Sequence, residues 1–440
     1  MIKLILLALI LIIVVNTLLI ATAKGSSITK QLQGYIDKTF GSMLNKDVDN
    51  LKENNDKADT AFIYGTNQEE TAKSITVDNK GNVYICVHRT DFENESSNLV
   101  IKISSTGTKL GSPFKLDTLG NISYVSANSI FFFKDALYVA GYGKKNDLER
   151  MVVTKIDPYT MQPTGFKQSI IGGYDPSDRL VANALFVNSQ GIFVAGFLGT
   201  SLHVAKLDHN TGKVITSYSL PSSSHSSLIY AEGAYDIVGD STYVYVVGDK
   251  YSDSTQQDVV VVKLKQQDLS LDTSFNYQGY VTLDSIVGGS NHDRGRSIAI
   301  DGKRQRLYVC GFSSKVFVVC LDTVTGDNVV QFGNAGFVQL FVNYSSSRAF
   351  SVDVDLQGKV YVGGDFLTDH GYRAFVCRLN PDGTKDTSFA NGGYIVFHGI
   401  AGGISDTIQS IFVDNRFGRF VTGGSVSKNN DSDAFVIKLI

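Results

Sequence analysis

One short phrase returns seven times along this chain of 440 residues. It consists of a strand that ends in a small residue and Gly, followed by a second strand that ends in Lys-Leu-Asp or a close variant. The copies recur about every 51 to 60 residues, and a fixed period of this size is typical of propellers and arrays. The second strands are Val100–Ile103, Val153–Asp157, Val204–Asp208, Val261–Leu264, Val319–Asp322, Val376–Asn380 and Val436–Ile440.

Each repeat also contains two further strands. It opens with the register small-apolar-x-apolar-Asp, as in Ser74–Asp78 and Ser351–Asp355, and it closes with a fourth strand such as Gly393–Phe397. Four antiparallel strands make one blade of a propeller. The small Ser or Ala that opens most inner strands suits the crowded wall of a central channel. The sequence therefore predicts an all-β fold, a seven-bladed β-propeller.

The two ends of the repeat region predict how the ring closes. The seventh copy stops at Ile440, directly after its third strand, and an additional strand, Thr60–Tyr64, precedes the first copy. We expect this N-terminal strand to complete the last blade. Such a closure removes two exposed sheet edges and joins the chain ends.

The composition limits the class of protein and its partners. With 43% hydrophobic and 19% charged residues the chain is globular, and a net charge of −3 gives no reason to expect a nucleic-acid partner. The cysteines lie inside predicted strands and form no Cys-x-x-Cys pair, so we interpret them as buried apolar residues rather than disulfides or zinc ligands: Cys86, Cys310, Cys320 and Cys377. No cofactor is predicted.

Residues 1–23 predict a signal peptide or a transmembrane anchor. An apolar run from Leu4 to Ile20 is longer than the usual signal core and approaches the length that spans a bilayer. Ala21 and Ala23 nevertheless fit the small-x-small pattern before a signal-peptidase site, so both alternatives stay open. Either one places the rest of the chain outside the cytosol, as a membrane-anchored or a secreted protein.

That setting gives a meaning to the Asn-x-Ser triplets of the chain. In a eukaryotic secretory route they are candidate glycosylation sites. They are Asn94, Asn121, Asn343 and Asn430.

Residues 24–58 have a different character from the repeats. Apolar residues from Ile28 to Leu51 recur at three- and four-residue steps, with a polar run after them. This pattern predicts an amphipathic helical linker or stalk between the N-terminal segment and a propeller domain at 59–440.

Two segments resemble a known repeat. Arg378–Gly393 and Leu271–Tyr280 carry the phrase Asp-Thr-Ser-Phe-x-x-x-Gly, and Gln331–Gly336 is a degenerate third copy. The phrase resembles the delta-60 repeat, a propeller-type repeat of largely unassigned function. The resemblance implies a propeller in an extracytoplasmic setting and no catalytic residues. The residues themselves predict a turn capped by a side chain, followed by a Phe that packs between blades.

The search for chemistry leads to one face of the ring. Loops that join the second strand to the third, and one blade to the next, share this face and receive most of the histidines: His88, His225, His292, His370 and His398. Polar loops collect such residues without any catalytic role. The candidates for a catalytic site at the channel mouth are His292, Asp293, Asp369 and His370, because we expect adjacent blades five and six to bring their loops together. No metal site is predicted, and the Asp-x-Asp-x-x-Gly segment Asp353–Gly358 is interpreted as a turn.

The sequence favours a non-enzymatic function. We expect an extracytoplasmic, membrane-anchored propeller that binds a protein or a glycan through its loops, since loops on a rigid scaffold are where binding normally resides. One alternative is a hydrolase or lyase with a site at the channel mouth. Another is a structural surface protein of a microbe or large virus.

Overall fold

The computed structural model describes a propeller and not the N-terminal segments. The described residues are 58–65, 69–90, 96–116, 123–145, 148–166, 169–172, 179–221, 233–252, 256–284, 286, 292–341, 343–390, 392–400, 403–426 and 432–439. By residue contacts, Lys57–Ile440 form one compact unit. The predicted signal or anchor at 1–23 and nearly all of the helical linker at 24–58 lie outside the described residues.

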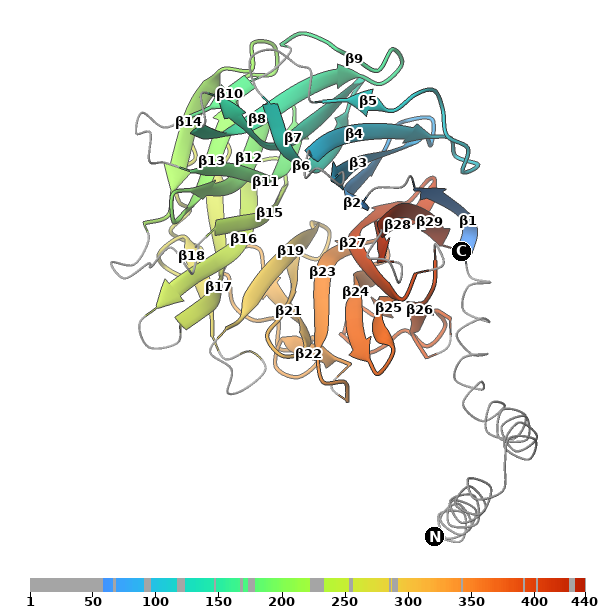
Figure 1. The fold of residues 1–440 in the computed structure, drawn as a ribbon. Helices are drawn as coiled ribbons and strands as arrows, with labels where there is room; N and C mark the ends of the chain where they lie inside the picture. Colours follow the sequence, from blue (N-terminus) through green and yellow to red (C-terminus); the bar gives the residue numbers. More distant parts are fainter. Residues whose placement is uncertain are drawn as a thin grey trace, which may run out of the picture. The chain divides into compact units, whose positions relative to one another are not determined.

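Seven antiparallel sheets make up this unit, and strands are the regular structure of its described residues (Figure 1). Blade one is β2 (Glu69–Val77), β3 (Val83–Thr90), β4 (Ser96–Ile103) and β5 (Phe114–Lys115). Blade two is β6 (Ser123–Phe133), β7 (Ala136–Lys145) and β8 (Leu148–Asp157), with a fourth strand split into β9 (Gln162–Pro163) and β10 (Ser169–Ile171). Blade three is β11 (Leu180–Asn188), β12 (Gly191–Leu198), β13 (Ser201–Leu207) and β14 (Val214–Ser219).

The other four blades follow the same order. Blade four is β15 (Gly233–Gly239), β16 (Tyr243–Ser252), β17 (Gln256–Lys265) and β18 (Tyr280–Leu283). Blade five is β19 (Arg294–Asp301), β20 (Arg306–Phe312), β21 (Val316–Asp322) and β22 (Phe337–Leu340). Blade six is β23 (Ser347–Val354), β24 (Val360–Thr368), β25 (Gly371–Leu379) and β26 (Tyr394–Phe397). Blade seven is β27 (Ser405–Asp414), β28 (Gly418–Val426), β29 (Ser432–Leu439) and β1 (Ala58–Tyr64).

The ring closes as the sequence predicts. Each inner strand packs against the inner strand of the next blade, and β27 of blade seven packs against β2 of blade one. The outer strand of blade seven is the N-terminal β1, which pairs with β29 from Thr60 opposite Lys438 to Tyr64 opposite Ala434. Figure 1 shows this first strand beside the last one. The seven-bladed propeller closed by an N-terminal strand is thus confirmed.

The repeated Lys of the third strand joins neighbouring blades. It lies opposite an aromatic residue of the second strand in five blades, as Lys102 does with Tyr84 and Lys206 with Phe193. Lys102 Nζ donates to the Pro158 carbonyl of blade two at 2.8 Å, and Lys206 Nζ donates to the Gln266 carbonyl of blade four at 2.8 Å. The phrase that recurs in the sequence therefore builds contacts between blades.

The Gly that ends the second strand is required by a close approach of two backbones. A Cβ atom at Gly311 would lie 1.9 Å from the Arg294 carbonyl oxygen of the inner strand, and one at Gly196 would lie 1.8 Å from that of Val181. Real Cβ atoms essentially never come that close to another heavy atom. Blade one has Val87 in this register, opposite Ala72.

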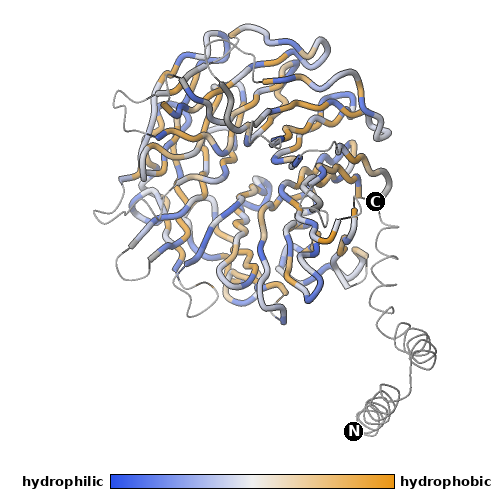
Figure 2. Tube along the Cα trace, viewed as in Figure 1, coloured by the Kyte–Doolittle hydropathy of each residue, from blue (hydrophilic) through white to orange (hydrophobic). Residues whose placement is uncertain are grey.

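Buried side chains from adjacent blades form the core. Each apolar cluster combines two neighbouring blades, and Figure 2 shows hydrophobic residues concentrated along the strands. All four cysteines are buried and unpaired, as predicted. The predicted role of the Asp-Thr-Ser-Phe phrase is confirmed. Asp386 caps its turn by accepting from Ser388, and the buried Phe275 belongs to one core cluster with Leu307 and Phe317 of the next blade.

Candidate functional site

A β-bulge in each inner strand turns one side chain toward the axis of the ring. The register of every inner strand shifts by one residue near its middle. Bulges re-aim side chains in this way. The seven bulge residues, here called the bulge ring, are all partly exposed: Lys73, Asn128, Asn183, Tyr235, Arg296, Phe350 and Gln409. Together with the residue that follows each of them, they line an axial cavity of about 100 Å³.

In five blades the residue after the bulge connects its blade to the next. Ser74 Oγ accepts a hydrogen bond from the Ile130 amide at 3.2 Å, and Ser351 Oγ accepts one from the Ile411 amide at 3.0 Å. In blade four Asp236 replaces the small residue, and its carboxylate accepts from the Ile298 amide at 3.0 Å. These bonds hold the inner strands together around the axis and fix the positions of the bulge ring.

Charged groups on the cavity wall have perturbed protonation. Burial lowers the pKa of Lys73, and burial raises the pKa of Asp236 to about 6. The neighbouring Asp249 accepts from the Gly295 amide, and burial raises its pKa to about 7 although Arg296 acts against the shift. The wall therefore combines two cationic residues with the Asp236 carboxyl group, and burial raises the pKa of this group and of Asp249 nearby.

Arginine and aromatic side chains from blades four to six stack on one another beside the cavity. The Arg296 guanidinium lies 4.3 Å from the ring centre of Tyr235 and 5.4 Å from that of Phe312, and Phe312 lies 5.8 Å from Phe350. The Arg348 guanidinium continues the stack, at 5.2 Å from Phe350 and 4.4 Å from Tyr372. We call these residues the arginine–aromatic stack: Tyr235, Arg296, Phe312, Phe350, Arg348 and Tyr372.

The outer end of the stack reaches the face that carries the loops. Phe312 ends β20, whereas Arg348 and Tyr372 stand at the second positions of β23 and β25, which begin on that face. Arg348 binds the fully buried Asp365 at 2.7 Å and 2.8 Å, so its guanidinium is fixed in place. The residues of the stack are thus partly exposed, and they run from the axial cavity to the loop face, here called the channel mouth.

The sequence-predicted catalytic residues lie in two separate settings. His292 forms a bridge with Gln257 of blade four, and Asp293 is buried beside it. Asp369 and His370 form the turn between β24 and β25 of blade six, where the adjoining Gly371 packs on the connection to blade seven. Their part in a catalytic site stays a prediction. Across the described residues, three or more His, Cys, Asp or Glu side chains are nowhere grouped to hold a metal.

The structure also brings His398 close to Asp406, a pair that the sequence does not reveal. His398 Nδ1 lies 3.8 Å from the buried Asp406 carboxylate, whose charge acts to raise the pKa of His398. Burial and the nearby Arg373 outweigh it and lower that pKa. Ser405 Oγ accepts from the Tyr372 amide at 3.1 Å, so this corner adjoins the outer end of the stack.

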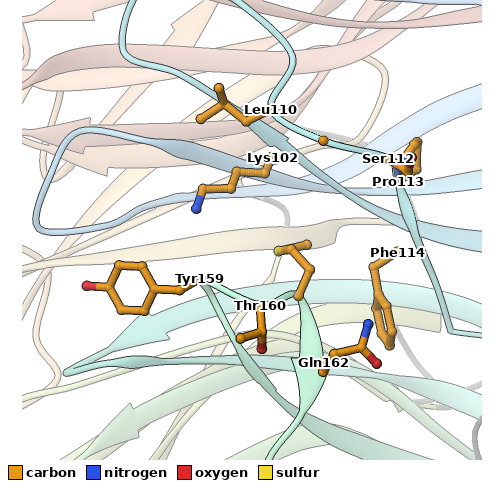
Figure 3. Close-up of a pocket in the computed structure, with 10 residues that line it drawn as sticks. Lys102, Leu110, Ser112, Pro113, Phe114, Tyr159, Thr160 and Gln162 are labelled. Carbon is orange, nitrogen blue, oxygen red and sulfur yellow. The ribbon is translucent and has the colours of Figure 1, made fainter.

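Grooves between blades form a further kind of concavity. The one between blades one and two measures about 470 Å³, and Figure 3 shows Lys102 facing Tyr159 and Thr160 across it. Lys102 already donates to the Pro158 carbonyl and lies 5.6 Å from the Tyr159 ring. We interpret this groove as the inter-blade contact of the repeated Lys.

Comparison with known proteins supports the repeat architecture. Residues 244–275 and 358–389 match the model of a family described as a domain of unknown function (DUF5122) beta-propeller. Both matches end at the Phe of the Asp-Thr-Ser-Phe phrase, which confirms a propeller repeat there, whereas the delta-60 name stays a prediction. No curated protein matches the chain. Among solved structures, a similar one is the WD40 beta propeller domain of Doa1, with 12% identity, a TM-score of 0.48, and coverage of 87% of this chain and 96% of that chain.

Of the predicted glycosylation sites, only one lies within the described residues. Asn343 lies exposed in the connection from β22 to β23, while the other glycosylation candidates, Asn94, Asn121 and Asn430, lie outside. In the part of the chain that the structure describes, no helix has the length and apolar character needed to cross a membrane.

Proposed function

We propose that this protein is a non-enzymatic binding module, held at a membrane outside the cytosol by residues 1–23, whose channel mouth binds a protein ligand. The observation that carries the proposal is the arginine–aromatic stack. Tyr and Arg are the residue types that dominate binding energy at protein interfaces. Here they are partly exposed, adjacent and held by a rigid ring.

The rigidity of the stack favours binding. Ordering long side chains on association costs about 0.5–1.5 kcal/mol for each one that is immobilised. Arg348 is already fixed by Asp365, and Arg296 is already held between two rings. A ligand that contacts them therefore meets side chains that have lost this freedom on folding.

The setting outside the cytosol rests on the sequence. The apolar run Leu4–Ile20 is long enough to anchor the chain. A retained anchor keeps the full-length protein in the membrane pellet after high-salt and carbonate washes. A mature N-terminus at Lys24 would instead establish a cleaved signal.

Ligand capture by the full-length protein tests the binding function. Tyr372→Ala removes an exposed ring of the stack and leaves the Arg348–Asp365 pair intact, so folding is retained. Arg416→Ala, which removes an arginine from the turn between β27 and β28 on the opposite face, is the matched control. We expect the same proteins to crosslink to the wild type and to Arg416→Ala. Their affinity for Tyr372→Ala should be at least about 10-fold lower than their affinity for the wild type. Equal binding by all three proteins would remove the channel mouth as the ligand site.

A further inference from the structure

Two cations of the bulge ring have no hydrogen-bond acceptor among the described residues. Lys73 and Arg296 make no hydrogen bond or close ion pair with any described residue, and Arg296 Nε is buried without an acceptor. The Arg296 guanidinium lies near the rings of Tyr235 and Phe312, and its N–H donors lie in the plane of the guanidinium group. Both side chains line the axial cavity.

Three other cations of the propeller, buried or half-buried, are paired. Lys206 donates to the Gln266 carbonyl, Lys263 binds Asp272 at 2.8 Å, and Arg348 binds Asp365 at 2.7 Å. A cation that loses water without gaining an acceptor is costly, and proteins pair such groups. Lys73 and Arg296 differ from these three paired cations.

We propose that the axial cavity binds a small carboxylate or oxyanion, which Lys73 of blade one and Arg296 of blade five contact from different sides of the ring. A cavity of about 100 Å³ admits an ion of the size of acetate or sulfate. The Gln409 amide of blade seven adds a neutral donor on the same wall. This site goes beyond the proposed function, because a small ion at the axis needs no contact with a ligand on the loop face.

Carboxyl groups near the cavity are engaged by the wall itself. Asp236 accepts hydrogen bonds from Ser297 Oγ at 2.7 Å and from the Ile298 amide. Asp249 accepts from the Gly295 amide and from Gln257 Nε2, both at 3.1 Å. Burial raises the pKa of both groups, so their negative charge near neutral pH is reduced. The two cations are left as the groups that lack acceptors.

Binding of simple anions to the full-length protein tests the site. The probes are sodium sulfate and sodium acetate at low millimolar concentration, titrated against sodium chloride at constant ionic strength, with calorimetry and the melting temperature as readouts. Such concentrations keep the general stabilising effect of sulfate small. The variants are Lys73→Met, Arg296→Gln and Gln409→Glu, and the last one adds a negative charge to the ring with almost no change in shape. Lys303→Met removes an exposed charge from the turn after β19 and is the matched control.

The proposal predicts saturable binding of sulfate or acetate to the wild type and to Lys303→Met. It predicts at least 10-fold weaker binding to the three ring variants. Lys73→Met should also melt no lower than the wild type in chloride, because it removes a desolvated charge, whereas a purely structural lysine would lower the melting temperature. No saturable binding to the wild type, or equal binding to Gln409→Glu and Lys303→Met, would overturn the proposal.

Discussion

At the scale of single residues, the inner wall of the propeller contains carboxyl groups that favour their neutral form. Burial raises the pKa of Asp236 to about 6 and that of both Asp249 and Asp353 to about 7, from an ordinary value of 3.8. A carboxyl group whose pKa is higher in the folded state binds its proton more tightly there. It stabilises the fold at low pH, and this stabilisation is lost as the pH rises through the folded-state pKa.

The free energy of unfolding should therefore fall between about pH 4 and pH 7, that is, between the ordinary and the raised pKa values of these groups. For each pH unit by which the folded-state pKa of a group exceeds its unfolded value, the group's contribution to the free energy of unfolding falls by about 1.4 kcal/mol as the pH rises through that interval. Other groups add their own contributions. Asp353→Asn should flatten this dependence, because one of the titrating groups is gone. Denaturant unfolding at several pH values measures the effect. A free energy of unfolding that rises steadily to pH 8, with the same slope in Asp353→Asn, would contradict it.

The residue scale also separates what the sequence predicts from what it does not. The Lys, Gly and Phe positions recur in register, so their structural roles could be inferred from the repeats. The bulge position holds a different residue in almost every blade, from Lys73 to Gln409, and a search for repetition passes over it. The bulge position could be found in the sequence as the residue directly before the small residue of each inner strand. It is the position in this part of the repeat where the residue type varies.

At the scale of elements, close backbone contact within each blade explains the small-Gly pair. Gly311→Ala should destabilise the propeller by about 3 kcal/mol or more, because its Cβ would overlap the Arg294 carbonyl oxygen and the two strands would have to separate. Gly302→Ala is the matched control in the same blade, since nothing lies within 4 Å of its added Cβ. Urea unfolding of both variants checks this. If Gly302→Ala lowered the free energy of unfolding as much as Gly311→Ala does, the close backbone contact at Gly311 would be contradicted.

The arrangement of elements also explains why the candidate site was only partly foreseen. The order of the strands within a blade determines on which side of the ring each loop lies. The sequence therefore correctly indicates the loop face. Which side chains meet depends on register between blades that are far apart in sequence. Arg296 meets Tyr235 across a blade boundary, and His370 lies toward blade seven. Neither relation is visible in a single repeat.

At the scale of the whole molecule, the propeller depends on one strand from the start of the repeat region. β1 supplies the outer edge of blade seven and pairs with β29 over most of its length. Its partly buried Phe62 and Tyr64 pack against the core between blades seven and one. Without β1 this blade has three strands. The unpaired backbone groups along the edge of β29 could then form hydrogen bonds with strands of other chains.

Deletion of this strand tests the account of a closed ring most directly. Two variants of the full-length chain are compared by thermal unfolding, one without residues 58–64 and the other without residues 24–50. We predict that loss of 58–64 lowers the melting temperature by roughly 10 °C or more, while loss of 24–50 leaves it nearly unchanged. Equal melting temperatures for the two deletions would contradict closure of the ring by β1.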